Sequence, residues 1–307
     1  MYEKILVPLD GSELAEVALP YAEEMGWRIS SEVTLLQVSE TGESQRFHEH
    51  EIYLQREASI VKRNIAHHLG KEQEENIGVK SVVTEGYPAE EIVDYAEKSD
   101  IDMVIMATHG RTGVRRWALG SVADKVVRAA SQPVVLIRTG EIHHGMTGIR
   151  EKDMLNAILV PLDGSKESEA ILPYIEELAR RVEAEVILLQ VVEMTHHVYA
   201  ARGTVAPLPY NKNEMEALTK HAKEYLEGVS DLLRARGVAV KSEVRVGIDA
   251  REIIRAAGEL HADLVALTTH RRTGAGQGAF WSVADMILRS GNAPIMLVRG
   301  PWPGSEQ

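Results

Sequence analysis

The chain contains the same sequence block twice, and this duplication constrains its fold more than any other feature. Residues 5–12 read Ile-Leu-Val-Pro-Leu-Asp-Gly-Ser, and residues 158–165 repeat the same eight residues. Further matches follow in the same order in both halves, and the last aligns residues 135–138 with residues 296–299. Ordered matches of this kind predict two domains of the same fold joined in tandem.

Each half alternates short apolar runs with segments in which apolar residues recur at helical spacing. In the first half we expect strands at about residues 4–9, 32–38, 79–84, 102–107 and 133–138. These runs are almost wholly apolar, as is typical of strands that helices cover on both faces. Strands that alternate with helices indicate parallel βαβ units. We therefore predict an α/β fold made of two tandem doubly wound domains, each a five-stranded parallel sheet with helices on both faces.

The duplication also predicts the domain boundaries. We expect a first domain, a linker, a second domain and a tail at residues 1–139, 140–153, 154–300 and 301–307. The linker carries several glycines and histidines and few apolar residues. Residues 39–49 and 193–213 differ most between the halves, so we expect them to be surface excursions.

Composition excludes several classes of function. The formal net charge of -12 opposes binding to nucleic acid or to an anionic membrane. The absence of cysteine excludes disulfides, iron–sulfur clusters and thiol chemistry. The sequence has no apolar run of about 18 residues, so we expect no membrane span. The first residues lead directly into a strand without a signal-peptide pattern, and we expect a cytoplasmic protein.

The first candidate site is the turn Pro8-Leu9-Asp10-Gly11-Ser12, where the first strand meets the first helix. Ligands of open α/β sheets bind at the carboxyl ends of the strands. Asp10 would place a carboxylate there that can bond a ribose hydroxyl or hold Mg²⁺. Alternatively, Asp-Gly-Ser is simply a tight strand-to-helix turn with a helix-capping serine.

The second candidate site is the segment of residues 107–121, which follows the fourth strand and ends where a helix begins. Gly110 allows close backbone approach to a ligand, and Gly120-Ser121 opens a helix whose unpaired N–H groups attract phosphate. Arg111 adds positive charge in a loop that is basic within an acidic protein. Alternatively, this is a surface loop with a glycine at each end. It is not a Walker loop.

These motifs resemble the universal stress protein family, and the resemblance covers both halves outside the linker and the two variable segments. The family signature is Gly, two residues, Gly, nine residues, then Gly followed by Ser or Thr. Gly110, nine residues and Gly120-Ser121 match it, whereas Ala107 replaces the first glycine. Members that carry this signature bind ATP, so the resemblance implies an ATP site in the first domain.

The resemblance also assigns roles to individual residues. The adenosine side is implied to be lined by Pro8, Leu9 and Asp10, with backbone bonds to adenine from Val38. The ribose and phosphates are implied to contact Ala107, His109, Gly110, Arg111, Gly120, Ser121 and Val122. His109 has an alternative role, in which its imidazole packs against its own turn.

The second copy departs from the signature at two glycines. Arg271 stands in place of Gly110, and Trp281 stands in place of Gly120. Both changes put a large side chain where the backbone would meet phosphate, so we predict no tight ATP binding in the second domain. Asp163 and Val191 remain, so part of an adenine pocket can persist in the second domain, and an alternative is that Arg271 itself supplies a phosphate contact.

The closing strands, residues 134–138 and 295–299, are expected at sheet edges, where bare apolar edges favour pairing. The resemblance implies that they pair with each other and form an intramolecular pseudo-dimer, which can associate further into a homodimer. The leading hypothesis is an ATP-binding stress-response or regulatory factor with a protein partner that the sequence does not identify. The alternatives are a slow ATPase and a ligand-free structural interaction module.

Overall fold

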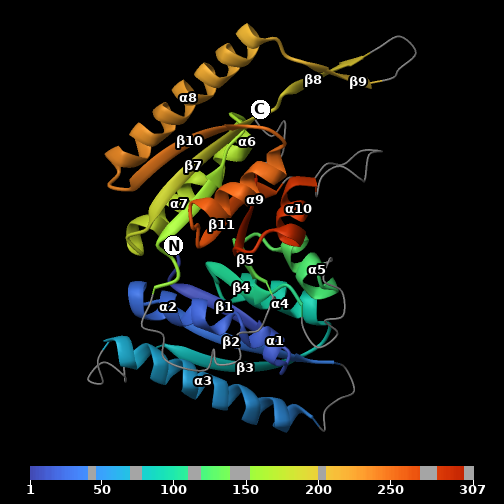
Figure 1. The fold of residues 1–307 in the computed structure, drawn as a ribbon. Helices are drawn as coiled ribbons and strands as arrows, with labels where there is room; N and C mark the ends of the chain where they lie inside the picture. The colour runs from blue at the N-terminus through green and yellow to red at the C-terminus, as the bar shows by residue number, and fades with distance from the viewer. Residues whose placement is uncertain are drawn as a thin grey trace. The chain divides into compact units, whose positions relative to one another are not determined.

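The computed structural model describes residues 1–40, 46–69, 78–109, 119–138, 153–199, 205–269 and 282–300. The chain divides into two compact units (Figure 1). The first comprises Met1–Asn156 and Asn292–Arg299, and the second comprises Ala157–Gly291 and Gly300–Gln307.

The first unit repeats a strand–helix alternation from its first residues. Its elements are β1 (Lys4–Leu9), α1 (Glu13–Glu16), α2 (Leu19–Ile29), β2 (Glu32–Ser39), α3 (Phe47–Leu69), β3 (Val79–Glu85), α4 (Pro88–Lys98), β4 (Met103–Ala107), α5 (Ser121–Ala129), β5 (Val134–Ile137) and β12 (Ile295–Arg299). Its strand order is β3-β2-β1-β4-β5-β12, and the first five strands are parallel. The helix α3 packs along β3 and against α2, whereas α4 packs against α5 (Figure 1).

The second unit follows the same pattern with one addition. Its elements are β6 (Ala157–Pro161), α6 (Lys166–Glu169), α7 (Leu172–Arg181), β7 (Glu185–Val192), β8 (Thr195–Tyr199), β9 (Val205–Pro209), α8 (Lys212–Ala235), β10 (Ala239–Val246), α9 (Asp249–Glu259), β11 (Leu264–Thr269) and α10 (Ser282–Ser290). Its parallel strands run in the order β10-β7-β6-β11. The addition is the antiparallel hairpin β8–β9, which joins β7 to α8 (Figure 1).

The fold confirms the predicted tandem, doubly wound α/β architecture with mostly parallel sheets. The strand that the sequence predicts as the fifth of the second copy, β12, groups with the first unit. It runs antiparallel to β5, with Met296 opposite Val135. All four residues of β5 are buried, and pairing along an apolar edge satisfies backbone groups that would otherwise face solvent.

Local sequence explains why the first helix is interrupted. Ser12 caps α1 and accepts a hydrogen bond from Ala15 N at 3.3 Å. Pro20 lies in the first turn of α2, where its missing N–H costs nothing, and it restricts the conformation of the residue before it. The apolar residues at helical spacing between Leu14 and Met25 therefore fall in two helices, α1 and α2.

Candidate functional site

The predicted site residues of the first unit come together at the carboxyl edge of its sheet. Asp10 directly follows β1, Val38 is the next-to-last residue of β2, and Ala107 ends β4. Because β1 is hydrogen-bonded to both β2 and β4, these three strand ends are neighbours. Parallel strands place their ligands at this edge. The described site residues with buried side chains or backbones are Pro8, Leu9 and Ala107, whereas Asp10, Val38, His109, Gly120 and Val122 are half-buried and Ser121 is exposed.

Four of the residues that the two signature loops contribute cannot be placed. Gly110 and Arg111 lie outside the described residues, as do Arg271 and Trp281 of the second copy. The same holds for most of the predicted linker and for the tail.

The carboxylate of Asp10 is held by its own turn. Its Oδ1 accepts hydrogen bonds from Ser12 N at 3.0 Å and from Ser12 Oγ at 2.5 Å. Gly11 adopts a φ of 79°, a left-handed conformation that favours glycine. The second unit repeats this turn, with Asp163 Oδ1 accepting from Ser165 N at 2.9 Å. The turn thus fixes the direction of the carboxylate in both units.

The charge on Asp163 is maintained by this turn. Burial raises the pKa of the Asp163 carboxyl, but hydrogen bonds from Ser165 and Ser168 outweigh burial and hold the pKa below its usual value. The group is therefore an anion at neutral pH.

Gly120 allows α5 to begin directly against the end of β4. Its N–H donates to Thr108 O at 2.9 Å, and no side chain caps α5. A Cβ atom on residue 120 would lie 2.9 Å from the same Thr108 oxygen, which is closer than real Cβ atoms approach backbone. The position therefore accepts glycine alone without backbone movement. It leaves the first N–H groups of α5 uncovered by side-chain caps, as an anion site requires.

His109 lies between β4 and α5 in the chain. Its Nδ1 is 3.2 Å from Thr108 Oγ1, and the residue is half-buried. This contact favours the alternative in which the imidazole packs against its own turn.

Polar groups that the sequence reading did not single out lie at the ends of β2 and β3. Gln37 Oε1, Ser39 Oγ and Thr84 Oγ1 are buried and have no hydrogen-bond partner among the described residues. Gln37 and Ser39 interrupt an apolar strand, and this interruption is the signal that could have identified them. Buried polar groups without partners are costly, so they mark this end of the sheet as a place where a ligand or water can bind.

A hydrogen-bonded tyrosine–glutamate pair occurs in both units, and its glutamate lies on the short helix that follows the Asp-Gly-Ser turn. Tyr53 Oη donates to Glu16 Oε1 at 3.0 Å, and Tyr225 Oη donates to Glu169 Oε1 at 2.9 Å. Burial raises the pKa of both phenols above the ordinary value, followed by the charge of Glu16 for Tyr53 and by the hydrogen bond to Glu169 for Tyr225. Burial and Glu16 likewise raise the pKa of Glu57. The pairs tie α3 to α1 and α8 to α6 in an equivalent way.

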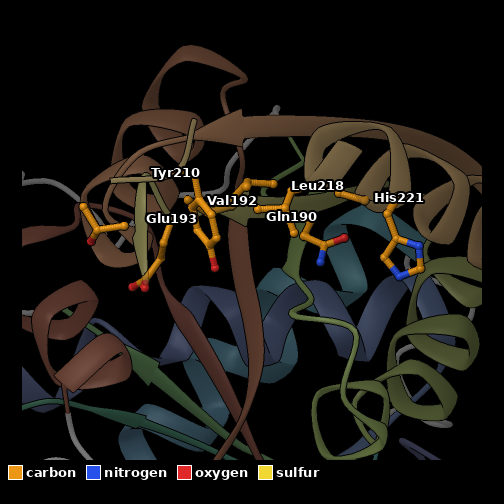
Figure 2. Close-up of a pocket in the computed structure, with 9 residues that line it drawn as sticks. Gln190, Val192, Glu193, Tyr210, Leu218 and His221 are labelled. Carbon is orange, nitrogen blue, oxygen red and sulfur yellow. The ribbon is translucent and has the colours of Figure 1, made fainter. Parts of the chain in front are cut away.

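The second unit has a pocket of about 350 Å³ at the carboxyl end of β7 (Figure 2). It is lined by Gln190, Val191, Val192, Glu193, Thr195, Tyr210, Leu218, His221 and Ala222. Gln190 Oε1 is buried and accepts no hydrogen bond from the described residues. Val191, at which the sequence left open a partial adenine pocket, belongs to this lining.

Three carboxylates, those of Asp163, Glu193 and Asp249, lie near the pocket at the carboxyl end of β7. The pKa of Asp249, at the start of α9, rises to about 6 because its carboxyl is buried and because Glu193 and Asp163 are nearby. An acid whose pKa is raised by folding binds its proton more tightly when folded. Its ionisation therefore costs stability as the pH rises from about 4, where the unfolded group ionises, to about 6.

We expect Asp249→Asn to remove this cost. Between pH 4 and pH 7 the variant should retain on the order of 1 kcal/mol of unfolding free energy that the parent protein loses, a figure reduced for the partial exposure of the group. Urea unfolding across that pH range measures it. Asp231→Asn, at an exposed ion pair on α8, is the control and should leave the pH profile unchanged. Parallel profiles of the parent and Asp249→Asn would contradict the assignment.

Comparison with known proteins shows the family. The model of the universal stress protein family matches residues 1–138 and again residues 154–299. The chain belongs to the universal stress protein family. Universal stress protein MJ0577 of Methanocaldococcus jannaschii is 32% identical over 155 residues, which cover 45% of this chain and 96% of that protein.

Two further relatives extend this assignment. The universal stress protein of Methanothermobacter thermautotrophicus is 33% identical over 144 residues, which cover 45% of this chain and 97% of that protein. The crystal structure of a universal stress protein from Archaeoglobus fulgidus has a TM-score of 0.63 and 18% identity, and the match covers 97% of this chain and 99% of that chain. The Methanothermobacter thermautotrophicus protein corresponds in length to one repeat, whereas the Archaeoglobus fulgidus structure shares the fold of both repeats. Among the helices that the structure describes, none has the length and apolar character needed to cross a bilayer.

Proposed function

We propose that this universal stress protein binds ATP in its first domain and acts as a nucleotide-dependent stress-response or regulatory factor. The observation that carries the proposal is the start of α5. Gly120 brings an uncapped helix N-terminus against the end of β4, beside the strand ends that carry Asp10 and Val38. A phosphate chain at this helix start and a nucleoside along the strand ends would occupy one continuous edge of the sheet.

The residue roles follow from this placement. Backbone groups of Val38 would bond adenine, and Asp10, fixed by Ser12, would bond the ribose. The N–H groups of Ser121 and Val122 would receive the phosphates together with His109, Gly110 and Arg111. Asp10 fits Mg²⁺ only as a single carboxylate ligand, because the described residues contain no cluster of three or more metal-binding side chains. Phosphate oxygens and water would have to complete its coordination.

The second domain would serve as a partner domain without a tight ATP site of its own. It keeps the Asp-Gly-Ser turn but carries Arg271 and Trp281 in place of the two glycines. The pairing of β12 with β5 supports an intramolecular pseudo-dimer built on the closing strands. ATP in the first domain would then alter the surface that such an assembly offers to a protein partner in the cytoplasm.

The experiment that tests this function is nucleotide analysis of the purified protein. The protein is denatured, and the released small molecules are identified by mass spectrometry; the emptied protein is then titrated with ATP, ADP and AMP by calorimetry. We expect one adenine nucleotide site per chain. Release of phosphate on prolonged incubation with ATP would favour the slow ATPase instead. A protein without co-purified nucleotide that gives no binding heat at millimolar ATP would favour the ligand-free module and contradict the proposal.

A further inference from the structure

The pocket of the second unit is formed by three elements that meet at the carboxyl end of β7. The strand contributes Gln190 and Val192, the start of the hairpin contributes Thr195, and α8 contributes Leu218 and Ala222. Figure 2 shows the amide of Gln190, the phenol of Tyr210 and the carboxylate of Glu193 extending toward the same side of the strand. A volume of about 350 Å³ is within the range of small-molecule sites.

Several lining positions differ between the two repeats, and one of them replaces a large side chain with a small one. The pairs Tyr53–Glu16 and Tyr225–Glu169 align α3 with α8, and they also align Leu54 with Leu226, both of which are fully buried. Ala222 therefore corresponds to His50, which lies three residues before Tyr53. Both side chains are buried, at 2% and 8% exposure. The first unit thus buries an imidazole where the second buries a methyl group beside the pocket.

The charge around the pocket is negative. Glu193 is the acidic residue of the described lining, which contains no lysine or arginine. Burial, together with the nearby charges of Glu193 and Asp163, holds the pKa of the Asp249 carboxyl above its usual value. Phosphate would add negative charge to this group, whereas a cation would relieve the repulsion.

The pocket also contains an acceptor without a donor. Gln190 Oε1 is fully buried, and none of the described residues donates a hydrogen bond to it. A buried acceptor without a partner is costly, and a ligand N–H would remove that cost if the amide of Gln190 turned its oxygen toward the pocket. Val192, Leu218 and Ala222 provide apolar wall for a short hydrocarbon stem. The Gln190 acceptor, the Glu193 carboxylate and the apolar wall together indicate which kind of ligand the pocket fits.

We propose that this pocket binds a small organic cation, an ammonium or guanidinium group on a short apolar stem. The N–H groups of the cation would donate to Gln190 Oε1 and to the Glu193 carboxylate, and the stem would lie against Val192 and Leu218. The site is separate from the nucleotide site proposed for the first domain and does not depend on it. It gives the second domain a ligand of opposite charge in place of ATP.

The test uses the full chain and agmatine, which carries guanidinium and ammonium groups on a four-carbon stem. Calorimetric titration should show binding of agmatine, and 1,4-butanediol, a stem of the same length without charge, should give no heat. Glu193→Gln should weaken agmatine binding about threefold to fivefold, the range of an exposed ion pair. Glu193 is exposed, so this variant keeps its fold. Glu224→Gln, at an exposed ion pair on α8, is the matched control and should bind agmatine normally.

A second variant tests whether binding needs the free volume of the pocket, independently of the charge on Glu193. Ala222→His introduces the residue of the first repeat and should abolish agmatine binding while ATP binding by the chain is unchanged. If that variant fails to fold, Gln190→Met, which keeps the volume and removes the acceptor, should weaken binding instead. The proposal is overturned if agmatine gives no heat at millimolar concentration, if 1,4-butanediol binds equally well, if Glu193→Gln binds like Glu224→Gln, or if ATP displaces agmatine.

Discussion

Replacing Gly120 with tryptophan, the residue that the second repeat carries at position 281, is expected to weaken ATP binding by at least about 100-fold, or about 2.7 kcal/mol. The first atom of any side chain at this position would lie 2.9 Å from the carbonyl oxygen of Thr108. The start of α5 must then move away from the end of β4. The indole would in addition cover the N–H groups that the proposed function assigns to phosphate.

Titration calorimetry with ATP measures the loss, and circular dichroism checks that the variant stays folded. Gly120→Ala should give an intermediate loss, because its single methyl group meets the same oxygen without covering the N–H groups. Gly228→Ala, on α8, is the matched control, because a Cβ there meets nothing within 4 Å. It should leave ATP affinity unchanged and add about 0.5–1 kcal/mol of stability. If Gly120→Trp binds ATP as the parent does, the site has been placed wrongly.

The fold could be predicted largely because its strands are buried on both faces. Such strands appear as apolar runs, and the predicted bounds of β1 agree with the structure. The hairpin β8–β9 was not predicted, because its segment includes Pro207 and Pro209 and has no long apolar alternation. The grouping of β12 with the first unit could not be read from local pattern either, since pairing partners are set by tertiary contacts.

Some features of the candidate site can likewise be predicted from local sequence, whereas others depend on tertiary contacts. The Asp-Gly-Ser turn and the role of Gly120 depend on neighbouring residues, so the sequence indicated both. The Tyr53–Glu16 pair joins residues 37 positions apart, and no local sequence pattern predicts it. The pocket of the second unit is lined in part by a small side chain, Ala222, and its counterpart His50 becomes clear only when the tyrosine pairs align α8 with α3.

Replacing Glu24 with alanine is expected to lower the free energy of unfolding of the first unit by about 3–5 kcal/mol. The Glu24 side chain, on α2, is 3% exposed and accepts three hydrogen bonds. The donors are Arg28 Nη1 at 2.8 Å, Met154 N at 2.7 Å and Leu155 N at 3.1 Å. The variant would leave the two backbone N–H groups without their acceptor and would remove the principal anion beside Arg28, whose side chain is 11% exposed.

The same carboxylate fixes the chain where it leaves the first repeat. Arg28 also donates to Leu155 O at 3.2 Å, so α2 binds both N–H and carbonyl groups of the segment around residues 154–155. Glu24→Gln keeps an acceptor but loses the charge, and it should cost less than Glu24→Ala. Asp94→Ala, at an exposed ion pair with Lys98, should cost under about 1 kcal/mol. Guanidinium unfolding of the full chain measures all three. Equal losses for Glu24→Ala and Asp94→Ala would show that the buried carboxylate does not hold this segment, and limited proteolysis near residue 154 should then be no faster in Glu24→Ala than in the parent.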